Sequence, residues 1–179
     1  MSFFRYFGVL ALAVGWITIT ISIMLNPWFS IMNNALSDLG ALGLKHAWVF
    51  NLGLTISGFL AVLYSIYLLW ATKSKLEALA SSIFFLSAVH LILIAAFPEG
   101  TYPHLLVSFE FFILSGISIL VFGIALMVQG NPRFGLTFSL LSAVGFISAA
   151  LAPWPSTGSL EVFAIILMSV WAALMLKHV

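Results

Sequence analysis

Apolar and polar positions alternate along this chain on a long scale, with apolar stretches of about 20 residues separated by short polar breaks. An α-helix of about 20 residues crosses a hydrocarbon core of about 30 Å, so each stretch is long enough to be a membrane span. The pattern predicts helices over residues 6–25, 47–70, 76–97, 104–129, 133–152 and 159–177. The expected fold is therefore all-α, a single polytopic membrane domain of six transmembrane helices over residues 1–179.

The connection over residues 26–46 is the only long one, and its composition is unlike that of a loop. Apolar residues are interleaved with Asn33, Asn34, Ser37 and Asp38. We expect a short helix here, either at the membrane interface or re-entrant, because irregular backbone at membrane depth persists only when protein covers it or water reaches it.

Composition narrows the class of protein. Only 6% of residues are charged and the mean hydropathy is +1.22, whereas a soluble domain carries about 25% charged residues. A formal net charge of +1 without a basic cluster gives no case for a nucleic-acid partner. The absence of cysteine from the sequence excludes disulfides and thiolate chemistry.

The few charges are divided between the two sides of the predicted bundle. Five of the six basic residues fall on one side, namely Arg5, Lys73, Lys75, Arg133 and Lys177. Four of the five acidic residues fall at or near the other side: Asp38, Glu99, Glu110 and Glu161. Because cytoplasmic loops are enriched in Lys and Arg, we expect a multi-pass protein of the cell membrane with both termini in the cytoplasm.

Candidate chemistry gathers on the outer side. Asp38, Glu99 and His104 have the side chains of general bases or of metal ligands, and Asn34 and Ser37 lie beside them as candidate ligand-binding residues. A divalent metal such as zinc would suit these donor types, although no His-x-x-x-His or His-x-x-Glu-His spacing occurs. The alternative is structural, because Asn, Ser and Asp are also the favoured capping residues of short helices.

Two further polar residues lie within spans. His90 and Glu110 are at similar depths on the third and fourth spans, which a tight turn joins, so we expect them to face each other. A buried acid in a membrane needs a partner, a proton or water. The pair is therefore either a ligand-binding element or a structural clamp between two helices. For Glu161 the sequence favours a simpler role, a carboxylate at the N-terminus of the sixth helix.

The segment Asn34-Ala-Leu-Ser-Asp-Leu-Gly40, following Asn26-Pro-Trp-Phe29, resembles the signature of the DUF998 family of small polytopic membrane proteins. Phe97-Pro-Glu99 followed by His104 is similar to that family's second pattern, although Glu99 comes directly after Pro98 where one intervening residue is expected. The resemblance covers nearly the whole chain, including the number of spans. It implies a site at these residues and no particular activity.

Three function classes remain open. The protein could bind a lipid head group or small ligand in an outer Asp/Glu/His cup, with or without hydrolysing or modifying that lipid. It could be a transporter or an ion or proton channel that uses Glu110 and His90. It could also be a receptor, chaperone or assembly factor. A polar cup on one side favours binding or enzymology; the expected partners are membrane lipids, and a homo-oligomer is compatible with the sequence.

Overall fold

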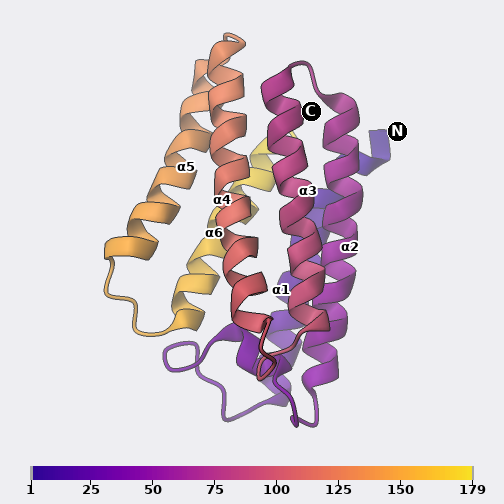
Figure 1. The fold of residues 1–179 in the computed structure, drawn as a ribbon, viewed down its shortest axis with the longest axis vertical. Helices are drawn as coiled ribbons and strands as arrows, with labels where there is room; N and C mark the ends of the chain where they lie inside the picture. Colours follow the sequence, from indigo (N-terminus) through magenta and orange to yellow (C-terminus); the bar gives the residue numbers. More distant parts are fainter. Residues whose placement is uncertain (1, 179) are drawn as a thin grey trace.

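The structure is a computed structural model that describes residues 2–178 and contains six long α-helices (Figure 1). They are α1 (Phe7–Leu25), α2 (Ala47–Ala71), α3 (Lys75–Ala96), α4 (His104–Val128), α5 (Pro132–Leu151) and α6 (Thr157–Met175). All six are long and apolar enough to cross a membrane, and the described residues form no strand. The six-span prediction is confirmed, and every helix boundary lies within two residues of its expected position.

The helices run up and down, and each of α1 to α5 packs mainly against its neighbours in the sequence. The last helix, α6, returns to the first, where Trp16 Nε1 donates to Ser169 Oγ at 3.1 Å. Both described ends of the chain lie at the same end of the bundle (Figure 1). We call this the basic end, since Arg5, Lys73 and Lys177 are there. The opposite acidic end consists of residues 26–46, 97–103 and 152–156.

Small residues allow α3 and α4 to approach closely. The fully buried hydroxyls of Ser87 and Ser115 lie 2.6 Å apart, and Ser118 Oγ donates to the carbonyl oxygen of Ala80 at 2.9 Å. Such residues favour helix association in a membrane, because close backbones gain dispersion energy and their hydroxyls find partners. Towards the basic end, a core of aromatic side chains surrounds the buried Trp171 and Tyr64.

The packing of α5 determines the shape of the acidic end. Gly123 of α4 and Gly135 of α5 lie against each other's backbone near the basic end. Further along, α5 leans away from α4 (Figure 1). A cavity lies there, between α4, α5 and α6.

Residues 26–46 fold across the acidic end and contain the expected short helix, a 3-10 turn η2 (Leu36–Gly40). The segment is fixed from three sides. The amide of Asn51 on α2 donates to the Gly40 carbonyl at 3.0 Å, and the N–H of Gly158 on α6 donates to the Asn34 carbonyl at 3.0 Å. The N–H of Leu42 donates to the Glu99 carbonyl at 3.0 Å. The segment therefore joins α2, α6 and the α3–α4 turn.

Candidate functional site

Three of the predicted site residues meet at the acidic end. Glu99 in the α3–α4 turn places Oε2 3.0 Å from Nε2 of His104, the first residue of α4. The same oxygen accepts a longer hydrogen bond of 3.4 Å from the hydroxyl of Ser37 on η2. His104 is buried, whereas the Glu99 side chain is 40% exposed. The sequence motifs around residues 37, 99 and 104 thus form one connected group.

The ring of His104 is held at both nitrogens. Nδ1 lies 2.8 Å from the carbonyl oxygen of Phe97, and because a carbonyl only accepts, Nδ1 must carry a hydrogen. In a neutral ring Nε2 would then be an acceptor, facing a carboxylate oxygen of Glu99 that is also an acceptor. The contact is attractive only when a proton lies between them. His104 is therefore held between Phe97 and Glu99, and its predicted catalytic role stays a prediction.

Asn34 and Asp38 have mainly local roles in the structure. Asp38 Oδ2 accepts the N–H of Ala35 at 3.0 Å and the side-chain amide of Asn34 at 3.3 Å. Asn34 Oδ1 in turn accepts the N–H of Ser30 at 3.0 Å. These bonds stabilise the turn that leads into η2, so they agree with the capping interpretation of this motif. They leave the predicted catalytic role of Asp38 untested.

Glu161 takes a position that the sequence did not indicate. We expected its carboxylate to stabilise the N-terminus of α6, but Ser156 and Ser159 cap that helix. Instead, Glu161 Oε2 accepts the N–H of Leu36 on η2 at 2.6 Å. Glu161 and Asp38 thus accept the N–H groups of the consecutive residues 36 and 35, which brings two carboxylates to one turn.

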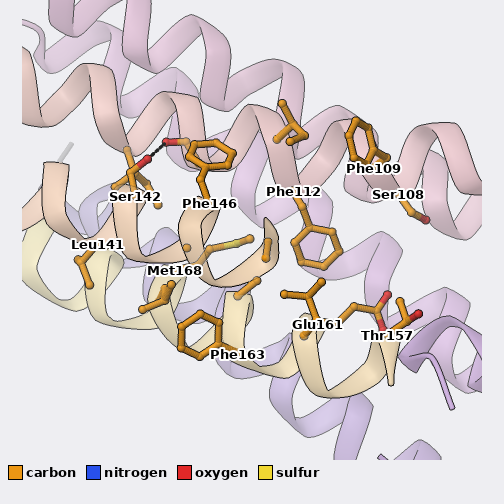
Figure 2. A pocket seen from close by; sticks show the side chains of 18 of the residues that line it. Ser108, Phe109, Phe112, Leu141, Ser142, Phe146, Thr157, Glu161, Phe163 and Met168 are labelled. Carbon is orange, nitrogen blue, oxygen red and sulfur yellow. Dashed lines mark hydrogen bonds between the residues drawn. The ribbon is translucent and has the colours of Figure 1, made fainter. Parts of the chain in front are cut away.

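Beside this turn lies a cavity of about 260 Å³ between α4, α5 and α6 (Figure 2). Its walls are almost entirely apolar, and Leu141 and Met168 line the part furthest from the acidic end. At the acidic end the lining residues include Glu161, Thr157 and Ser108. Ser108 Oγ lies 3.3 Å from Nε2 of His104, which connects the cavity to the Glu99–His104 pair. The cavity is thus apolar, and most of the few polar residues among its lining lie towards the acidic end.

The predicted contact between His90 and Glu110 is present, with Nε2 and Oε2 2.8 Å apart. The pair lies on α3 and α4, and neither residue lines the cavity. The structure thus separates these two candidates from the residues at the acidic end.

Metal binding receives no geometric support within residues 2–178, where no three His, Asp or Glu side chains are grouped as metal ligands. The acidic end nevertheless has more carboxylates than basic side chains. Every ion pair among residues 2–178 joins a histidine to a glutamate. Lys45, which is the one basic residue at the acidic end, is exposed. Asp38 and Glu161 therefore have no cationic partner there.

A family model described as "Protein of unknown function (DUF998)" matches residues 9–178. No curated protein matches the chain, and no solved structure matches it.

Proposed function

Since the chain belongs to the DUF998 family, whose description gives no activity, we propose from its own residues that it binds a single-chain membrane amphiphile with a cationic head group. The hydrocarbon chain occupies the cavity between α4, α5 and α6. The head group lies at the acidic end, against Glu161 and Ser108. One observation carries the proposal: Glu161, whose carboxyl group has no cationic partner among residues 2–178, lies at one end of an otherwise apolar cavity.

The volume and the lining both support this class of ligand. Sites for small molecules have volumes of about 300–1,000 Å³ and are mostly apolar with a few polar groups that fix orientation. A cavity of about 260 Å³ is close to the lower limit, which favours one hydrocarbon chain over two. A cationic or hydrogen-bond-donating head group would pair with Glu161, whereas a phosphate would be repelled by Glu161 and Asp38.

The proposed orientation follows from the basic residues at the other end. With Arg5, Lys73, Lys75, Arg133 and Lys177 in the cytoplasm, the acidic end faces outward, and the amphiphile enters from the outer leaflet. The membrane is then the cell membrane, with both termini inside.

We favour binding over hydrolysis because of the contacts that His104 already makes. Ser108 is the hydroxyl nearest to a histidine at the cavity, but the same Nε2 already contacts Glu99. A serine nucleophile requires a base with a free lone pair. Transport is less favoured, because apolar side chains such as Ile119, Leu141 and Met168 line the inner part of the cavity.

The proposal is tested with a photoreactive alkylamine and a fatty acid of equal chain length, each cross-linked to the purified protein in lipid nanodiscs. We expect the amine to label the cavity walls and the fatty acid to label them weakly. Glu161→Gln should reduce amine labelling about ten-fold or more, since a hydrogen bond to a charged group is worth about 1.5–3 kcal/mol.

Two neighbouring alanines of α5 provide a matched control. Ala149 lines the cavity and Ala150 does not, and both are exposed. Ala149→Trp should fill the cavity and abolish labelling, whereas Ala150→Trp should leave it intact. Equal labelling by both variants, or stronger labelling by the fatty acid, would reject this function.

A further inference from the structure

His90 and Glu110 form a second polar site that is separate from the amphiphile cavity. Glu110 lies six residues after His104 on α4, about 9 Å along the helix at 1.5 Å per residue. Ser108 and Phe112, which line the cavity, lie two residues before and two after Glu110. A displacement of two residues turns about 200° around a helix, so Glu110 points away from these two residues and, like His90, does not line the cavity.

The pair is open on the side away from the bundle. The side chains of His90 and Glu110 are 19% and 43% exposed, within helices that span the membrane. Glu110 Oε2 contacts His90, while Oε1 has no hydrogen-bond partner among residues 2–178. Ionisable side chains in spans almost always face a bundle interior or a wet cavity, which makes a carboxyl group half-exposed to lipid unusual.

The hydrogen bonds of His90 require a bound proton. Its Nδ1 lies 2.8 Å from the carbonyl oxygen of Leu86, so Nδ1 carries a hydrogen. Nε2 of the neutral ring and a carboxylate oxygen of Glu110 would then be two acceptors at 2.8 Å. A proton must lie between them, giving either imidazolium with carboxylate or imidazole with carboxylic acid. The two residues hold that proton as a unit.

Few other titratable groups are near this proton. Of the spans that pack against α3 and α4, α2 carries Tyr64 and Tyr67, α5 carries Arg133 and α6 carries Glu161, while α3 itself carries Lys75 and Glu77 and α4 carries His104. Arg133 begins α5 at the basic end, and Glu161 lines the cavity, which neither His90 nor Glu110 does. Gly58 of α2 packs against Ile92 of α3, which places both tyrosines at least six residues further towards the basic end. Lys75 and Glu77 begin α3 at that end, and His104 contacts Glu99 instead.

We infer that His90 and Glu110 form a proton-binding site open to the lipid, independent of the amphiphile site. Its ligand is the proton itself. The carboxyl group of Glu110, with the proton that it shares with His90, is thus accessible to reagents dissolved in the membrane.

A lipid-soluble carbodiimide tests both parts of this inference, because it reacts with protonated carboxyl groups. The carboxyl proton moves to one carbodiimide nitrogen while the carboxyl oxygen bonds to the central carbon. The resulting O-acylisourea then rearranges to a stable N-acylurea, with no oxidation or reduction. Dicyclohexylcarbodiimide is added to the full chain in lipid nanodiscs, and modified peptides are identified by mass spectrometry. A water-soluble carbodiimide with a quaternary ammonium group is the control reagent.

We expect the lipid-soluble reagent to modify Glu110 and the water-soluble one to leave it unmodified. Glu110→Gln should abolish this modification. His90→Phe should accelerate it several-fold, because the carboxyl proton is then neither transferred to nor hydrogen-bonded by an imidazole. His90→Gln, which keeps a hydrogen-bonding side chain without a basic nitrogen, should also accelerate it and serves if the phenylalanine variant does not fold.

Three results would overturn the inference: no modification of Glu110, equal modification by both reagents, or an unchanged rate in both His90 variants. Ala149→Trp should leave the rate unchanged, so failure of the amphiphile proposal and failure of this one are distinguishable.

Discussion

The contact between Gly123 and Gly135 predicts a specific cost for adding one methyl group to α5. A Cβ at position 135 would lie 2.7 Å from the carbonyl oxygen of Gly123 and 2.8 Å from the backbone nitrogen of Met127, whereas ordinary contacts begin at 3.4 Å. Both obstacles are backbone atoms, so α5 would have to retreat by about 0.6–0.7 Å. Overpacking of this kind costs about 1–3 kcal/mol.

Gly145, on the same helix, supplies the matched control. Its Cβ would meet only Leu167 Cδ1, at 3.3 Å, and that flexible side-chain end can move aside. Replacing Gly by Ala inside a helix gains up to about 1 kcal/mol in either position. The gain cancels when Gly135→Ala and Gly145→Ala are compared, so the difference between them measures the overpacking alone.

The measurement is reversible unfolding in mixed micelles with increasing dodecyl sulfate, followed by tryptophan fluorescence. We expect Gly135→Ala to be less stable than Gly145→Ala by about 1–3 kcal/mol. Equal free energies of unfolding for the two variants would refute the close α4–α5 contact, and with it our account of why α5 diverges further along.

Two other predictions concern the core and the orientation. Trp171→Ala should lower the free energy of unfolding by about 3–5 kcal/mol, while Trp171→Phe should cost much less, because the buried Nε1 has no hydrogen-bond partner among residues 2–178; equal losses in unfolding experiments would contradict this. The chain has no cysteine, so Asn33→Cys and Asn131→Cys each introduce a single thiol. In intact cells an impermeant maleimide should label position 33 and spare position 131, and the reverse pattern would contradict the proposed orientation.

Hydropathy alone was sufficient to predict the helices, because each apolar stretch has to satisfy its own backbone hydrogen bonds in lipid. The contact of His90 with Glu110 was also predictable, since a tight turn places equal depths of α3 and α4 side by side. Both conclusions depend on neighbours in the sequence.

The role of Glu161 and the cavity were not predictable in this way. The carboxylate of Glu161 reaches Leu36 across a sequence separation of 125 residues, and that contact depends on how α6 docks against residues 26–46. Because Glu161 lies near the start of a helix, a local role at that helix was a sufficient explanation for it. The distant contact with Leu36 was therefore not expected. Ser108 gave only a weak signal, its spacing of four residues from His104 on one helix face.

The docking of α6 on residues 26–46 also has a consequence for biosynthesis. Membrane helices leave the ribosome in order, so α1 to α5 can pair with neighbours already made. The Asn34 carbonyl and the Leu36 N–H, in contrast, must wait for Gly158 and Glu161, and Trp16 must wait for Ser169. The acidic end is therefore completed in a late step of assembly, when α6 joins the first helix and the first loop.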